Sequence, residues 1–297
     1  MIEIPEELAR TQAKANGEAG RAFVAGLPDL AAEFVARWEL RLTGPAMYGV
    51  CALVLPVERA DGTAAMLKLQ LLDDESVGEP VALRLWEGAG AVRLLRHDPV
   101  TGAMLLEALD STRDLSGVES REAVRIIAEL LARLTAVPAP PEVRSLGDVA
   151  ARMLENVPAL SARLPDAAER ALLRDCAAAV REVAGEPGDR LLHWDLHYEN
   201  VLATFPGDPR GPWLAIDPKP LSGDPGFDLM PALDNRFDAA ETRWRFDLMT
   251  EVLDLDRQRA RAWTLGRVLQ NSLWDVADGE RALHPDQVSV ARALLTR

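Results

Sequence analysis

Apolar and polar positions divide the chain into a mixed N-terminal part and a longer, mainly helical C-terminal part. Over residues 5–40 the apolar spacing is helical, and Asp29 is placed to cap a helix within this stretch. Over residues 42–71 short apolar runs alternate with glycine turns, as in antiparallel strands. Two more strands are predicted over 92–95 and 103–107. These segments indicate a sheet preceded by a helical cover.

Helical spacing dominates the second part of the chain. Apolar residues recur every three to four positions over 119–134, and a proline-rich stretch at 138–141 ends this helix. Two further helices are predicted at about 146–160 and 166–183. The pattern therefore favours an α+β protein with an N-terminal sheet and a helical C-terminal part.

A polar loop at residues 193–200 lies within the helical part, with a short apolar run on each side. It holds Asp195 and, five positions later, Asn200, and the next short strand delivers Asp217. Phosphoryl transfer needs a carboxylate that accepts the proton of the attacking hydroxyl and hard oxygen ligands that hold Mg²⁺ on the ATP phosphates. We therefore predict Asp195 as the catalytic base and Asn200 and Asp217 as the metal ligands.

This loop has two other interpretations. An isolated Asp in a loop is usually a turn former, but here it is followed at kinase spacing by Asn200 and Asp217. Histidines four residues apart, as His193 and His197 are, bind zinc when they lie on a helix. Because these two lie in a loop without a glutamate between them, we expect His193 to hydrogen-bond the loop backbone and hold Asp195.

The loop motif, His193-x-Asp-x-His-x-x-Asn-Val-Leu, resembles the catalytic loop of the aminoglycoside phosphotransferases, small-molecule kinases with a protein-kinase-like fold. The string from Ile216 through Gly223 to Leu229 looks like that of the streptomycin 6-phosphotransferase and hydroxyurea phosphotransferase branch. The resemblance extends from about Leu42 to the end of the chain. It implies a two-lobed fold, with an antiparallel sheet and helices in the N-lobe and a mainly helical C-lobe.

The resemblance also implies an organisation of the chain. We expect a helical cover and nucleotide-binding N-lobe over 1–106, a hinge over 107–111, and a C-lobe with the catalytic loop and the acceptor site over 112–297. Asp224 and Asp228 are each placed to cap a helix or to brace the catalytic loop. In the resembling family the residue equivalent to Asp228 is the brace.

Lys68 interrupts an otherwise apolar strand. A buried lysine is costly unless it meets an anion, which suits the strand lysine that contacts the ATP phosphates; the alternative is an edge-strand lysine that faces water. The resemblance places its carboxylate partner at Glu79, with Glu75 as the second candidate. Ser76 and Glu79 are also spaced as a simple capping box.

Other nucleotide contacts are predicted from position. Gly44 and Gly49 flank a turn where kinases fold a glycine-containing loop over the phosphates. Taken alone, the two glycines are typical of a plain hairpin, and their position in the chain favours the phosphate loop. Adenine is expected at the backbone of Glu107, Ala108 and Leu109, where the last strand runs into a polar connector.

The acceptor site is predicted in the C-terminal helices, where polar and aromatic residues are interleaved. Its candidates are Asp234, Asn235, Asn271, Trp274 and Asp275. The stretch over 271–279 resembles the substrate-side helix end of aminoglycoside kinases, where carboxylates meet amino or guanidino groups. The alternatives are that Trp274 is a core residue and that Asp275 only shapes a helix end.

Composition narrows the choice of partner. The 297 residues include 33 basic and 47 acidic side chains, a net charge of −14, which argues against nucleic acid. This charge is compatible with a cationic substrate and also with simple solubility. The two cysteines are too far apart for a disulfide framework. Without a signal peptide or a membrane-spanning run in the sequence, we expect a cytoplasmic protein.

The leading prediction is an ATP- and Mg²⁺-dependent kinase that phosphorylates a hydroxyl of a streptomycin-like acceptor, cationic and polyhydroxylated. A sugar or metabolite kinase of the same fold is the second candidate. A catalytically silent nucleotide-binding module is disfavoured because the complete set of lysine, base and metal ligands is present. A protein kinase is disfavoured because residues 217–228 form too short a segment to dock a peptide.

Overall fold

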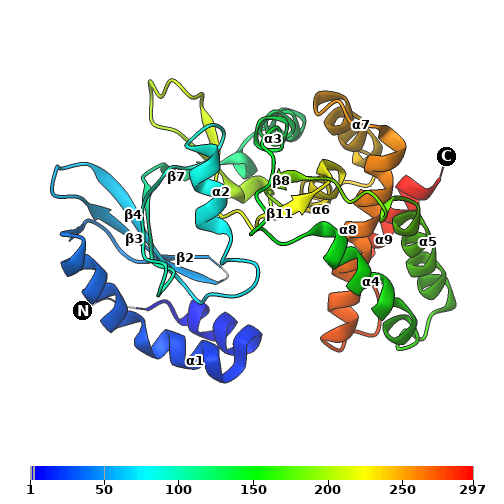
Figure 1. Cartoon of the computed structure of the whole chain (residues 1–297), viewed down its shortest axis with the longest axis horizontal. Coiled ribbons are helices and arrows are strands. Elements are labelled where there is room, and N and C mark those ends of the chain that lie inside the picture. The colour runs from blue at the N-terminus through cyan, green and yellow to red at the C-terminus, as the bar shows by residue number, and fades with distance from the viewer. Residues whose placement is uncertain (1, 3, 50, 297) are drawn as a thin grey trace. The chain divides into compact units, whose positions relative to one another are not determined.

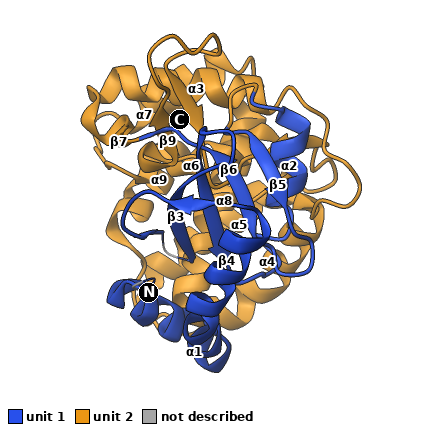
Figure 2. Ribbon diagram, turned by 90° about the vertical axis from the view of Figure 1, so that its left-hand side faces the viewer, with its two compact units in different colours: residues 1–88, 92–110 blue, residues 89–91, 111–297 orange. Residues whose placement is uncertain are grey.

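The computed structural model describes residues 2, 4–49 and 51–296. The chain divides into two compact units (Figure 2). Unit 1 comprises Met1–Gly88 with Val92–Asp110, and unit 2 comprises Ala89–Ala91 with Ser111–Arg297. Within the described residues, no helix is long and apolar enough to cross a membrane.

Unit 1 is built on an antiparallel sheet with the strand order β1-β3-β4-β6-β5, to which β2 adds by pairing with β3. Its strands are β1 (Arg41–Leu42), β2 (Met47–Tyr48), β3 (Ala52–Glu58), β4 (Ala64–Gln70), β5 (Leu94–His97) and β6 (Met104–Glu107). The long hairpin of β3 and β4 turns at Asp61–Gly62, where Gly62 has a φ of +81° that favours glycine. Because β4 lies between β3 and β6, its side chains are mostly buried.

The helical segment α1 (Glu6–Arg37) covers this sheet (Figure 1). It bends at Gly17, whose φ of 55° and ψ of −123° are not helical. The prediction that Asp29 begins a new helix is wrong, because α1 continues through Pro28. Leu27, which precedes the proline, joins the hydrophobic core of the sheet, and this burial offsets the backbone hydrogen bond that Pro28 cannot make.

Unit 2 is mainly helical (Figure 1). Its helices are α3 (Ser120–Leu134), α4 (Leu146–Ser161), α5 (Ala167–Val183), α6 (Met230–Asp234), α7 (Thr242–Val252), α8 (Arg257–Ala277) and α9 (Pro285–Leu295). The three helices predicted between residues 119 and 183 are confirmed, with side-chain caps from Glu119, Ser145 and Asp166. The longest of the unit, α8, packs against α4, α5 and α9, and most of its central residues are buried.

Small antiparallel sheets carry the loops of unit 2. One has the order β10-β9-β7 and the other pairs β11 with β8. The strands are β7 (Asp110–Asp114), β8 (Arg190–Leu192), β9 (Val201–Ala203), β10 (Trp213–Ala215) and β11 (Leu221–Gly223), and the 3₁₀ turns are η1 (Leu115–Gly117), η2 (Tyr198–Asn200) and η3 (Pro225–Asp228). The polar connector predicted after β6 begins at Asp110. From Asp110 the chain instead forms the edge strand β7, because these residues hydrogen-bond to β9 while their side chains are mostly exposed.

The remaining helix, α2 (Glu79–Trp86), belongs to unit 1. The two units together give the predicted α+β class, with an antiparallel sheet and helices in one and mainly helices in the other.

Candidate active site

The catalytic loop predicted from the sequence connects β8 to β9 and ends in the turn η2. Two hydrogen bonds fold it around the backbone of Asp195, whose carbonyl oxygen accepts from the His197 N–H at 3.0 Å and from the Asn200 side-chain nitrogen at 2.9 Å. These bonds use the main chain of Asp195 and leave its carboxylate for chemistry. Burial raises the pKa of that carboxyl, while the charges of His197 and Arg267 oppose the rise.

His193 ties the loop to the strand that precedes Asp217. Its ring is fully buried, and burial lowers its pKa to about 3, so the imidazole is neutral. The neutral ring donates from Nε2 to the carbonyl of Ile216 at 3.0 Å and accepts the Asp195 N–H at Nδ1 at 3.3 Å. The predicted role of His193 is confirmed. No cluster with the composition of a histidine, cysteine or carboxylate metal site occurs among the described residues.

Asp228, in η3, holds the catalytic loop by accepting hydrogen bonds from its backbone. Its carboxylate accepts the His193 N–H at 2.8 Å and also the Trp194 N–H. Burial raises the pKa of Asp228 to about 7, against the two N–H bonds that lower it. Asp224 has a different role, because it caps η3 through the Gly226 N–H at 2.8 Å. The structure therefore confirms Asp228 as the brace.

We expect Asp228→Ala to lower the free energy of unfolding by about 1–3 kcal/mol for each buried N–H that it leaves unpaired. It should also lower kcat, because Asp195 follows directly on the two residues that lose their anchor. Denaturant unfolding and steady-state kinetics measure the two effects. Asp224→Ala is the matched control, since it keeps both loop N–H groups paired and should cost less activity. Equal activity losses in the two variants would contradict the brace.

Asn200 and Asp217, the predicted metal ligands, are brought together by the pairing of β9 with β10. Asn200 directly precedes β9, and its backbone carbonyl accepts the Ile216 N–H at 2.9 Å, so Asp217 follows immediately at the same end of the hairpin. The Asn200 side chain donates an N–H to the Asp195 carbonyl, so its oxygen is the atom that the prediction assigns to the metal. Asp217, the other predicted ligand, already has a cation beside its carboxylate, because Lys219 Nζ is 3.0 Å from Asp217 Oδ1. The pair therefore fits Mg²⁺.

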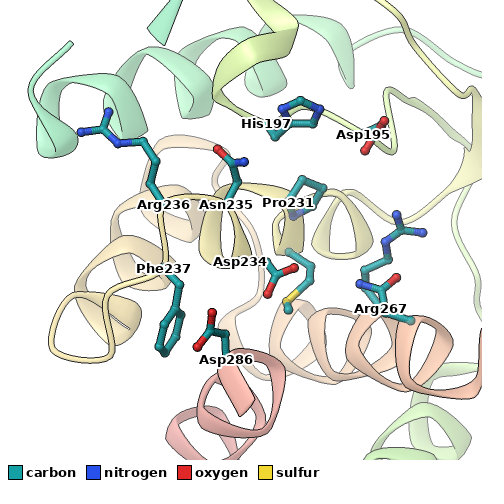
Figure 3. A pocket seen from close by; sticks show the side chains of 11 residues that line it. Asp195, His197, Pro231, Asp234, Asn235, Arg236, Phe237, Arg267 and Asp286 are labelled. Carbon is teal, nitrogen blue, oxygen red and sulfur yellow. The ribbon is translucent and has the colours of Figure 1, made fainter. Parts of the chain in front are cut away.

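A cavity of about 450 Å³ opens beside Asp195. It is lined by Asp195, His197, Met230, Pro231, Asp234, Asn235, Arg236, Phe237, Arg267, Asn271 and Asp286. In Figure 3 Asp195 and Arg267 lie at one end, and Asp234 and Asp286 come from α6 and α9 toward a common space. One oxygen each of Asp234 and Asn235 is buried and has no hydrogen-bond partner among the described residues.

Of the five predicted acceptor residues, Asp234, Asn235 and Asn271 line this cavity. Within the described chain, Trp274 and Asp275 are not part of the lining. Both belong to the last turn of α8, beyond the cavity: Trp274 is 42% exposed and packs edge-on against Trp194, and Asp275 accepts the Glu280 N–H through its backbone. This placement matches the alternative in which Asp275 shapes the helix end.

Sequence reasoning missed several lining residues, above all Arg267. The signal was present, because Arg267 stands in the apolar stretch Leu265–Leu269 of α8 just as Lys68 stands in its strand. Asp286 gave no comparable signal, since an acidic residue in the first turn of a helix is ordinary.

In unit 1, Lys68 forms the ion pair predicted from the sequence. Its Nζ lies 2.7 Å from both carboxylate oxygens of Glu79, and Gln70 donates to the same carboxylate at 2.9 Å. The side chains of Lys68 and Glu79 are 6% and 0% exposed, so the water-facing alternative for Lys68 is wrong. The capping box is also wrong, because α2 begins at Glu79 itself and the Ser76 hydroxyl bonds to Asp73. The role of this pair in nucleotide binding stays a prediction.

The other predicted nucleotide residues have less distinctive surroundings. Gly49 donates to the Ala52 carbonyl at 3.0 Å across the turn after β2; residue 50 of this turn lies outside the described residues. A Cβ at Gly49 would meet nothing within 4 Å, so packing does not demand glycine there. Gly44, which precedes β2 in the chain, lies beside Pro56. Phosphate binding by this turn stays a prediction.

The segment predicted to bind adenine begins at Glu107, the last residue of β6, which also hydrogen-bonds to a neighbouring part of the chain. Glu107 accepts the Arg93 N–H through its carboxylate at 2.7 Å and donates its own N–H to the Arg93 carbonyl at 3.0 Å. Ala108 and Leu109 then lead into β7. Adenine binding by the backbone of these three residues stays a prediction.

Comparison with known proteins identifies the family of this chain. Residues 37–279 match the family described as aminoglycoside/hydroxyurea antibiotic resistance kinase. The chain is 62% identical to a hydroxyurea phosphotransferase from Kitasatospora aureofaciens, over 100% of this chain and 87% of that protein. It is 55% identical to a streptomycin 6-kinase from Streptomyces glaucescens, over 99% of this chain and 97% of that protein.

Solved structures agree on the fold. A choline/ethanolamine kinase family protein from Mesorhizobium loti aligns with a TM-score of 0.66 at 19% identity, over 91% of this chain and 95% of that chain. The predicted protein-kinase-like fold is confirmed. Membership in a kinase family implies ATP as the phosphoryl donor. The chain therefore belongs to the aminoglycoside/hydroxyurea antibiotic resistance kinase family and is a phosphotransferase.

Proposed function

We propose that this kinase uses ATP and Mg²⁺ to phosphorylate a hydroxyl of a streptomycin-like aminoglycoside, with Asp195 as the catalytic base. The observation that carries the proposal is that Asp195 shares one cavity with Asp234, Asn235 and Asn271. Support also comes from the streptomycin 6-kinases from Streptomyces glaucescens and Streptomyces griseus, at 55% and 53% identity.

The chemistry assigns a separate task to each group. The acceptor hydroxyl gives its proton to the Asp195 carboxylate as its oxygen attacks the γ-phosphorus of ATP. The bond between the γ-phosphorus and the β,γ-bridging oxygen breaks, and ADP leaves. The raised pKa of the buried carboxyl favours this proton uptake. Asn200 and Asp217 would hold Mg²⁺, which supplies positive charge to the transferred phosphoryl group.

ATP itself is assigned to unit 1. Lys68, held by Glu79, would contact the α- and β-phosphates. Gly44 and Gly49 would cover the phosphates, and the backbone at 107–109, within a hinge over 107–111, would take adenine. Because the reaction consumes ATP, we retain the cytoplasm as the predicted location.

The acceptor is proposed to be polyhydroxylated and cationic. A guanidino or ammonium group would supply the donors that the buried oxygens of Asp234 and Asn235 lack. Asp286 adds a second carboxylate to the same wall. A cavity of about 450 Å³ is also within the range of sites for drug-sized ligands, about 300–1,000 Å³.

Hydroxyurea is the second candidate acceptor, favoured by the 62% identity to a hydroxyurea phosphotransferase. It is neutral and has only five non-hydrogen atoms, so it would fill a small part of the cavity and offer no charge to Asp234. A neutral sugar represents the metabolite-kinase alternative.

A direct acceptor assay separates these candidates. The purified protein would be incubated with ATP and Mg²⁺ and with streptomycin, hydroxyurea or a neutral sugar, and the products followed by mass spectrometry. We expect streptomycin to gain one phosphoryl group with the highest kcat/KM. A higher kcat/KM for hydroxyurea or for the sugar would overturn the aminoglycoside proposal and favour that acceptor.

The charge of the acceptor is tested at Asp234. We expect Asp234→Asn to raise the KM of a cationic acceptor by about tenfold, equivalent to about 1.4 kcal/mol, and to leave the KM of ATP unchanged. Asp275→Asn is the matched control, because Asp275 also has a raised pKa from burial but lies outside the described cavity lining. Equal effects of both substitutions would show that the cavity does not select the acceptor.

A further inference from the structure

Trp194, the residue before the proposed base, has an unusual conformation. Its φ is 67°, in the left-handed region that bulky side chains rarely adopt. The side chain is 2% exposed. Because a strained residue persists only when its surroundings hold it, something must fix Trp194 beyond the single N–H bond to Asp228.

Two arginines contribute to that constraint, beside the edge-on contact of Trp274 with the same ring. The guanidinium carbon of Arg144 lies 4.6 Å from the centre of the Trp194 ring, and that of Arg267 lies 4.7 Å from it. Both distances are well inside the range of cation–π attraction, about 6 Å. Arg144 comes from the segment before α4 and Arg267 from the middle of α8, so two remote elements hold one indole ring.

Arg267 differs from Arg144 in one respect. It also lines the cavity beside Asp195, and in Figure 3 its side chain extends from α8 toward the loop that carries Asp195. A hydrogen bond of 2.9 Å to Gln270 fixes its guanidinium. Its positive charge acts on the carboxylates of Asp195 and Asp234. Arg144 is not among the described residues that line the cavity.

We propose that Arg267 is a two-sided positioning residue. On one side it holds Trp194, together with Arg144, and so fixes the loop that presents Asp195. On the other side it forms the cavity wall against which the acceptor lies. The first part, the loop half, is that Arg267 fixes the loop through Trp194, and it stands on geometry alone. The second part, the cavity half, is that Arg267 forms the wall against which the acceptor lies, and it rests on the proposed function.

The loop half is tested without any acceptor. Hydrogen-exchange mass spectrometry of the peptide over 191–200 would be compared in the wild type, Arg144→Met and Arg267→Met. We expect exchange in this peptide to be about tenfold faster in both variants. Arg267→Lys keeps a cation that can contact the ring and should restore much of the protection. It also serves as the folded variant if Arg267→Met does not fold.

Arg121→Met is the matched control, because Arg121 stacks on Trp244 at a similar distance, 4.7 Å, in helices that carry no loop residue. It should leave exchange in the 191–200 peptide unchanged. Wild-type exchange of this peptide in both arginine variants, or equal acceleration in the control, would overturn the loop half.

The cavity half is tested by separating kcat from KM with the best acceptor found. Both methionine variants should lower kcat, by up to about a hundredfold, because a displacement of about 1 Å at a reacting group has that effect. Only Arg267→Met should also change the acceptor's KM; Arg144→Met should leave it at the wild-type value. Equal KM values in the two variants would overturn the cavity half. If no acceptor is phosphorylated by the wild type, the proposed function fails, and the exchange result still decides the loop half.

Discussion

Asp195→Asn is expected to abolish phosphoryl transfer while ATP binding stays close to that of the wild type. An amide cannot accept the proton of the attacking hydroxyl, and a positioned general base contributes about 10²–10⁴-fold to the rate. The substitution should leave the loop in place, because the bonds that shape it use the backbone of Asp195 and not its carboxylate.

Two measurements decide this prediction. Steady-state kinetics gives kcat, and isothermal titration calorimetry gives the Kd of ATP in both proteins. Denaturant unfolding of the variant controls for loss of structure. A fall in kcat of less than about tenfold would exclude Asp195 as the base.

Asp217→Ala is expected to have the second-largest effect, as a steep rise in the Mg²⁺ concentration needed for activity. A carboxylate contributes a full charge to the metal and an amide only a dipole, so Asn200→Ala should raise the requirement less. Excess Mg²⁺ should rescue Asn200→Ala only in part, because the Asn200 side chain also bonds to the Asp195 carbonyl.

Lys219→Met provides the control for this pair. It removes the cation that lies on Asp217 and keeps both proposed ligands, so the Mg²⁺ requirement should not rise. Titrating MgCl₂ at saturating ATP for all three variants gives the comparison. An unchanged Mg²⁺ dependence in both Asp217→Ala and Asn200→Ala would rule out the ligand assignment.

Much of the site could be predicted because its key residues violate the local pattern. A lysine inside an apolar strand requires a nearby anion, and the next helix offers Glu79 within reach. Asp195 and Asn200 lie in one loop, and Asp217 follows the strand β10 that pairs with β9, so a short hairpin expected from the spacing brings them close.

Features that depend on tertiary burial were harder to predict. α1 continues past Pro28 because the sheet buries its face, which local helix signals cannot indicate. The polar edge strand β7 forms because β9 offers it backbone partners. The cavity draws residues from the loop, α6, α8 and α9, and only their packing decides that Arg267 and Asp286 face it while Trp274 packs on Trp194.

The central claim is that the cavity beside Asp195 holds the acceptor with its reacting hydroxyl against this carboxylate. A crystal structure of Asp195→Asn with bound streptomycin tests it most directly. We expect a hydroxyl oxygen of the ligand within about 2.6–3.2 Å of the residue 195 side chain, with a guanidino group at Asp234. Streptomycin bound outside this cavity, or with no hydroxyl within reach of residue 195, would contradict the account.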